Sequence, residues 1–241
     1  MDVGFKKIRA LKSYEHVVDE IQTAICEGRL KAGDRLPSEM KLKEMFDTSR
    51  GSIREALRVL EQKGLVAVST GVKGGAVVQK ATSKPMADNV AILIRQRKIS
   101  LAHLAEFRKI MEGHIAAQAA MAAGRQDIEQ LQDILDEARA HIKTRPSGWE
   151  QFHKMDARFH IILAKIAGNP LIEANLAAVH DNIRTYFHHY LPWSLDLLKE
   201  NYQDLCEIVK AIRAKDCKKA ESIARNHVTR FNELMEKNAD H

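Results

Sequence analysis

The amino-acid sequence predicts a mainly α-helical chain: an N-terminal winged helix-turn-helix, with helices and a small β-hairpin wing, followed by an all-α helical bundle. Two short helical patterns joined by a polar turn, with two β-branched runs directly behind them, predict the first part. After residue 80 only helical periodicity is present, which predicts the second part. We place the first domain at residues 1–80, a linker at 81–88 and the helical domain at 89–241.

The first domain opens with a basic segment and a helical pattern at residues 13–27, and two short helices follow. Ser38 comes after a proline and offers a hydroxyl to the free amides of the first short helix. Residues 47–49 (DTS) break that helix and cap the next one, which places Arg50 in its first turn and Arg54 on its polar side. A tight turn followed by an arginine-bearing helix is suited to enter a DNA major groove.

A hairpin wing is expected directly after these helices. Residues 65–69 (LVAVS) and 76–79 (AVVQ) are β-branched runs, and the Gly-rich stretch between them contains Lys73. Glycines allow the backbone to approach a phosphate chain, and the lysine supplies positive charge. The alternative is an ordinary helix pair with solvated arginines and an unrelated hairpin, but the position of the wing favours DNA binding.

The N-terminal motifs resemble one known family. The stretch GRLKAGDRLPSE, then TSRGSIREALRVLEQKGLV and the Gly-rich wing, is similar to the GntR family of bacterial transcription regulators over residues 10–80. The resemblance implies binding to a double-stranded DNA operator as a homodimer, although Gly51 stands where the family more usually has a polar residue. The residues that it implies for DNA contact are Arg35, Ser38, Ser49, Arg50, Ser52, Arg54, Lys73, Gly74 and Gly75.

The composition agrees with these expectations. The formal net charge is +6, and residues 1–80 hold 15 Lys/Arg against 11 Asp/Glu, so the basic excess is concentrated in the N-terminal third. The cysteines Cys26, Cys206 and Cys217 have no paired spacing, which predicts a reduced, cytoplasmic protein. No apolar run approaches the roughly 20 residues of a membrane span.

The remaining sequence predicts a single helical bundle, in which glycines and prolines separate the elements. We expect helices near residues 86–97, 100–123, 126–142, 148–167, 170–190, 196–214 and 216–237.

Four polar residues lie on or beside the apolar stripes of three of these helices. They are Arg108, Asp156 with His160 four residues later, and His227. Buried ionisable groups must be paired or must meet a ligand, and Asp and His at this spacing are also common metal ligands. A satisfied core ion pair with two stray histidines is the alternative. Inward polar groups on three helices favour a ligand cavity.

The helical half also resembles a known domain. The stretches EFRKIMEGHIAAQAA, DARFHIILAKIAGNPLI and AIRAKDCKKAESIARNHV are similar to the all-helical, FCD-like effector domain of the FadR-type branch of GntR regulators. The resemblance implies that Arg108 helps to hold an acidic effector and that Asp156, His160 and His227 hold a divalent metal (Zn, Mn or Ni) and line the effector site.

The expected metal shell is incomplete in this chain. A further histidine of the family would fall at Leu205, which belongs to an apolar stripe. Asp204 and Cys206 are adjacent in sequence but are expected to point about 100° away on the helix. Three ligands leave a position for water or an effector carboxylate, and the sequence leaves both a metal-bound and a metal-free site open.

These observations predict an effector-responsive bacterial transcription regulator without enzymatic activity: a repressor released by a small organic or sugar acid, binding a near-palindromic operator as a homodimer. The alternative is a metal-dependent hydrolase-like helical domain tethered to a DNA-binding module, in which the three ligands activate a water. No nucleophile motif or phosphate loop accompanies them. A DNA-architectural protein without an effector would leave the inward polar groups unexplained.

Overall fold

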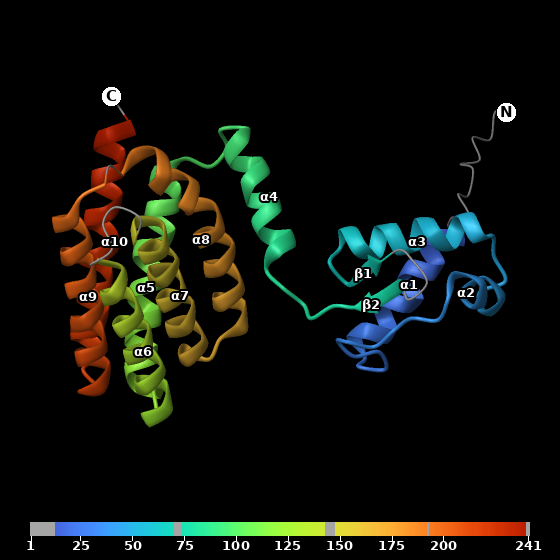
Figure 1. The fold of residues 1–241 in the computed structure, drawn as a ribbon, viewed down its shortest axis with the longest axis horizontal. Helices are drawn as coiled ribbons and strands as arrows, with labels where there is room; N and C mark the ends of the chain where they lie inside the picture. Colours follow the sequence, from blue (N-terminus) through green and yellow to red (C-terminus); the bar gives the residue numbers. More distant parts are fainter. Residues whose placement is uncertain (1–12, 70–73, 143–147, 192, 240–241) are drawn as a thin grey trace, which may run out of the picture. The chain divides into compact units, whose positions relative to one another are not determined.

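The chain forms two compact units that meet in sequence between Pro85 and Met86 (Figure 1). The computed structural model describes residues 13–69, 74–142, 148–191 and 193–239. Within these ranges the regular elements are helices and one two-stranded antiparallel sheet. The predicted fold class is confirmed.

The N-terminal unit packs three helices and a hairpin around one apolar core. Ser38 caps the second helix by accepting from the amide of Lys41 at 3.3 Å, and Ser49 caps the third by accepting from the amide of Ser52 at 3.0 Å. The core includes Val17, Ile53 and Leu60. The elements are α1 (Ser13–Cys26), α2 (Glu39–Met45), α3 (Arg50–Gln62), β1 (Val66–Ser69) and β2 (Gly75–Val78).

The wing pairs β1 with β2 in antiparallel register, from Val66 opposite Val78 to Ser69 opposite Gly75. The loop before α2 runs along the other edge of β2, because the amide of Leu36 donates to the carbonyl of Ala76 at 2.9 Å. The helices that are expected to read DNA are thus tied to the wing through the backbone. Lys73, expected at the tip, lies outside the described residues.

The C-terminal unit is a helical bundle in which α5 packs against α7, α8, α9 and α10 (Figure 1). Gly113 permits a close approach of α5 and α10, because a Cβ added there would lie 2.6 Å from Cγ of Arg225 on α10. The helices are α4 (Lys84–Arg95), α5 (Leu101–Ala122), α6 (Arg125–Ile142), α7 (Gly148–Ala167), α8 (Pro170–Tyr190), α9 (Leu195–Arg213) and α10 (Cys217–Ala239).

The observed helix bounds follow the Gly and Pro punctuation of the sequence closely. The largest change concerns α4, which begins at Lys84 and therefore occupies part of the stretch expected as a linker. Pro85 is the second residue of this helix, where its missing amide hydrogen costs no helical hydrogen bond.

Candidate functional site

The residues expected to contact DNA gather around the N-termini of α2 and α3 and the base of the wing. A groove of about 440 Å³ is lined by Ser38, Arg50, Gly74 and Gly75, among others. Arg54 is exposed on α3, one turn after Arg50. The structure thus brings four of the expected residues to one surface.

Several of the expected DNA residues also make local contacts within the N-terminal unit. Arg50 pairs with Glu39 at 3.1 Å through Nε, so α3 is tied to α2. The hydroxyls of Ser49 and Ser52 lie 3.0 Å apart, and the backbone of Arg35 bridges to Val77 of β2.

The helical unit buries many polar and charged side chains. Nine polar or charged side chains are buried among the described residues, and all of them belong to this unit. They are Arg108, Glu112, His153, Asp156, His160, His180, Asn201, His227 and Asn232.

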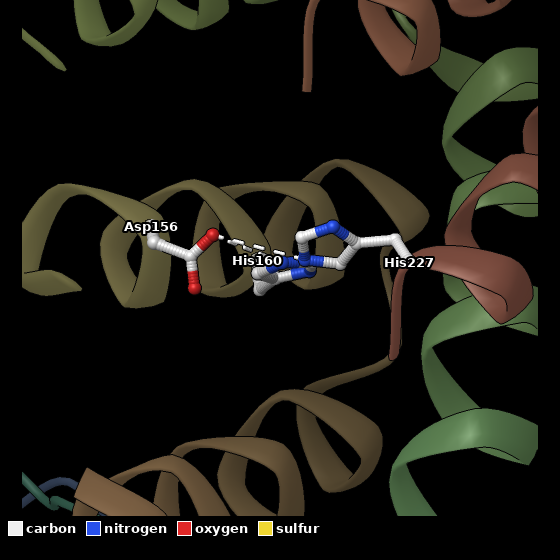
Figure 2. Close-up of side chains that lie close together, drawn as sticks. All are labelled: Asp156, His160 and His227. Carbon is white, nitrogen blue, oxygen red and sulfur yellow. Dashed lines mark ion pairs between the residues drawn. The ribbon is translucent and has the colours of Figure 1, made fainter. Parts of the chain in front are cut away.

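Three of these side chains converge on one point (Figure 2). Asp156 and His160 come from α7, where a spacing of four puts them on one face, and His227 comes from α10. The Nε2 atoms of both histidines lie 3.8 Å from Oδ1 of Asp156, and the possible ligand atoms all lie within 4.8 Å of one another. The structure therefore brings these three predicted residues together.

The donor set fits a divalent metal. Oδ1 of Asp156 and Nε2 of His160 are buried and have no hydrogen-bond partner among the described residues, and burying such atoms unpaired is costly. Ligand atoms about 2.0–2.1 Å from a tetrahedral ion lie roughly 3.3 Å apart. The observed 3.8 Å separations are slightly wider, so small side-chain rotations would close them on an ion.

Each histidine meets a second carboxylate through its other ring nitrogen. Nδ1 of His160 lies 2.6 Å from Oε2 of Glu112 on α5, and Nδ1 of His227 lies 3.0 Å from Oδ2 of Asp204 on α9. Asp204 also pairs with Arg230 of α10. Four helices thus contribute to the arrangement.

Glu112 contacts three of these buried side chains: Arg108, His160 and His180. Its Oε1 accepts from Nε of Arg108 at 2.6 Å and lies 3.2 Å from Nε2 of His180 on α8. Burial alone would raise the pKa of Glu112, but the positive charge of Arg108 and the neighbouring imidazoles hold it well below the usual 4.5. Glu112 therefore remains a carboxylate in the interior.

The same charges set the other pKa values of the cluster. Burial opposes charging His160, but Glu112 beside its Nδ1 outweighs burial and raises its pKa. Burial likewise opposes ionising Asp156, but His160 and His227 lower its pKa. For His180 the effect of burial is larger than that of the nearby Glu112 carboxylate, so the pKa of His180 is lowered.

Sequence reasoning missed three members of this cluster: Glu112, His180 and Asp204. Glu112 was detectable, because it follows Arg108 by one helical turn and a buried guanidinium needs a counter-charge. Asp204 was expected to point away from the site, yet it contacts His227 from the side opposite Asp156. Leu205, in the place of the family histidine, lies in the apolar core with Ile208.

No helix in the described ranges is long and apolar enough to cross a membrane. Two family models match the sequence: the FCD domain at residues 103–230, and the gntR family of bacterial regulatory proteins at residues 13–78.

The chain is similar to proteins that are named as transcription regulators. The chain is 29% identical to the HTH-type transcriptional repressor NanR of Cronobacter sakazakii, covering 94% of this chain and 86% of that protein. It is 28% identical to the putative HTH-type transcriptional regulator RmpR of Mycobacterium gastri, covering 94% and 81%. The solved structure of Streptococcus agalactiae GntR has the same fold, with a TM-score of 0.72 at 23% identity over 91% of this chain and 99% of that chain. The chain belongs to the gntR family of bacterial regulatory proteins, with an FCD domain as its C-terminal half, and is an effector-responsive DNA-binding transcription regulator.

Proposed function

We propose that this regulator is a repressor that leaves its operator when a small organic or sugar acid binds inside the helical unit. The observation that carries the proposal is the convergence of Asp156, His160 and His227 on one buried point. Relatives named as repressors support the direction of control. The matched families are regulators, which favours this function over a hydrolase tethered to a DNA-binding module.

A divalent metal (Zn, Mn or Ni) would be held by Asp156, His160 and His227. A bound metal supplies a positive charge and a vacant coordination position for an anionic oxygen. Leu205 offers no ligand atom there, so an effector carboxylate or water would take the position. Arg108 adds positive charge, although its Nε is engaged by Glu112. An acidic effector suits both features.

On the DNA side, a homodimer would present two copies of α3 to a near-palindromic operator. Pairing of half-sites multiplies the specificity that one small winged helix can supply. In a bacterium this takes place in the cytoplasm.

Helix α8 offers a physical link between the buried site and α4, the helix that follows the N-terminal unit in sequence. On one side of α8, His180 contacts Glu112. Two residues later, Nδ2 of Asn182 donates to the carbonyl oxygen of Ala87 in α4 at 2.9 Å. Effector binding that shifts α8 would therefore move α4 and change how the DNA-binding units are held.

The test begins with a thermal-shift screen of the purified protein against carboxylates and sugar acids, with and without Zn²⁺ and Mn²⁺. Stabilising acids are then titrated into the complex of protein and operator, followed by fluorescence anisotropy. We expect the acid to lower operator affinity in the wild type and to have little effect in His160→Ala. His114→Ala is the matched control, since His114 is an exposed histidine on α5. An acid that binds tightly without changing operator affinity would contradict the proposal.

A further inference from the structure

We infer that Glu112 and Asp204 are positioning residues that hold His160 and His227 in the same tautomer, so that both Nε2 lone pairs face Asp156. This inference rests on the proposed metal site, because a histidine can bind a metal only through a nitrogen that carries no proton.

The contact between Glu112 and His160 determines where the ring proton lies. A carboxylate accepts hydrogen bonds and cannot donate one. Oε2 of Glu112 makes no hydrogen bond of regular geometry among the described residues, but at the 2.6 Å that separates it from Nδ1 two lone pairs would repel each other strongly, so Nδ1 carries the proton. In a neutral ring Nε2 is then the free acceptor. That atom is buried, lacks a hydrogen-bond partner among the described residues and faces Oδ1 of Asp156.

His227 repeats this arrangement from another helix. Its Nδ1 lies 3.0 Å from Oδ2 of Asp204, the oxygen that Arg230 also contacts. Its Nε2 faces the same Oδ1 of Asp156 at 3.8 Å (Figure 2). The rings of His160 and His227 are stacked, with centroids 5.3 Å apart and planes at 27°. Two carboxylates thus direct two imidazoles toward one point.

The orientation of the Glu112 carboxylate is itself fixed. Oε1 is engaged by Arg108 and His180, which leaves Oε2 to face His160. Arg108 therefore supports the metal ligands through Glu112 in addition to any contact with an effector. Partners of this kind set the tautomer and orientation of a metal-bound histidine, and their loss typically weakens metal binding by about 10–100-fold.

The two carboxylates should differ in their response to conversion into the amide. In Glu112→Gln, the amide oxygen is held by the N–H donors of Arg108 and His180, so the NH₂ group faces Nδ1 of His160. His160 must then accept at Nδ1, which moves its proton to Nε2 and blocks the ligand atom. In Asp204→Asn, the amide oxygen can keep the place of Oδ2 and accept from both His227 and Arg230.

The experiment uses the full-length chain and two readouts. Long-range ¹⁵N–¹H NMR of the histidine rings, in mildly alkaline buffer without metal, should show protonated Nδ1 for His160 and His227 in the wild type. The proton of His160 should move to Nε2 in Glu112→Gln only. Zinc affinity, from competition with a chromophoric chelator, should fall about 10–100-fold in Glu112→Gln and much less in Asp204→Asn. Glu106→Gln, an exposed change on α5, should behave as the wild type.

The outcomes separate this inference from the proposed function. A wild-type His160 protonated at Nε2 would overturn the inference whether or not Glu112→Gln folds. So would a folded Glu112→Gln that binds zinc as the wild type does. A wild type with both rings protonated at Nδ1 but without zinc affinity would support the tautomer assignment and overturn the metal site.

Discussion

The two units of this regulator differ in whether they bury charged side chains. The described part of the N-terminal unit has an apolar core and carries its arginines on the surface around α2 and α3. Among its described residues, the helical unit buries an arginine, two carboxylates and four histidines. Exposed charges can meet a large anionic partner such as DNA, whereas buried charges can meet only something small enough to enter. The placement of charge therefore separates the two recognition tasks.

One ion pair from each unit illustrates this difference in burial. Arg50 and Glu39 lie 3.1 Å apart with side chains 63% and 33% exposed, while Arg108 and Glu112 lie 2.6 Å apart with both side chains 1% exposed. Solvent screens the first pair, so removing one partner costs little. The second pair has no solvent to replace a lost partner.

The largest expected effect is the difference in stability loss when the carboxylate of each pair is removed. Glu112→Ala leaves Arg108 charged in the interior and should lower the free energy of unfolding by about 3–5 kcal/mol. Glu39→Ala should cost less than about 1 kcal/mol. Urea unfolding followed by circular dichroism measures both, and Trp149 and Trp193 report the helical unit by fluorescence. Equal losses would show that burial is not what distinguishes the pairs.

The same contrast explains what the sequence could predict. Helices and caps depend on neighbours in the chain, so Ser38, Ser49 and Gly64 were sufficient to delimit α2 and α3. Asp156 and His160 were found because a spacing of four puts two side chains on one face of a helix.

The contacts made by Glu112, His180 and Asp204 depend on how separate helices pack, which periodicity within one helix does not specify. The expected angle of about 100° compared the directions of Asp204 and Leu205 around one helix. It carried no information on where a different helix, α10, places His227. Residues 70–73 of the wing, with Lys73, lie outside the described residues, so the contact expected there stays a prediction.

The next largest effect concerns the exposed arginines of the N-terminal unit. If Arg54 grips a guanine with two hydrogen bonds, Arg54→Ala should cost about 1–3 kcal/mol of discrimination between operator and scrambled DNA. Protein stability should be unchanged, because Arg54 is exposed. Arg125→Ala is the matched control, an exposed arginine of the helical unit paired with Glu129 at 2.8 Å. An equal loss of affinity for both DNAs would make Arg54 a phosphate contact.

A smaller effect is expected from acid. The pKa of Glu112 is lowered in the folded state, so its contribution to stability is present above pH 4.5 and is lost as the pH falls through the folded-state pKa. One such group adds up to about 1.4 kcal/mol per pH unit to the slope of stability against pH. Glu112→Gln removes the titrating group, so urea unfolding by tryptophan fluorescence should show a shallower slope below pH 4.5. Parallel slopes for the two proteins would contradict the role of Glu112.

The smallest effect compares two helical glycines, one in each unit. At Gly113 a Cβ would lie 2.6 Å from Cγ and 2.8 Å from Nε of Arg225, whose side chain pairs with Glu221 at 2.8 Å. Gly113→Ala must displace this side chain, and overpacking of about 1–3 kcal/mol outweighs the roughly 1 kcal/mol gained in helix propensity.

At Gly51, in the first turn of α3, a Cβ would meet only Oγ of Ser49 at an ordinary 3.6 Å. Gly51→Ala therefore keeps the gain in helix propensity, about 0.5–1 kcal/mol, and should raise the free energy of unfolding while Gly113→Ala lowers it. Thermal unfolding of both variants tests this difference in sign. Operator binding by Gly51→Ala adds a second result. Unchanged affinity would mean that the methyl group is accommodated at the DNA surface. A loss in a more stable protein would mean that the backbone at Gly51 approaches the DNA too closely for any side chain, which would explain a glycine where the family more usually has a polar residue.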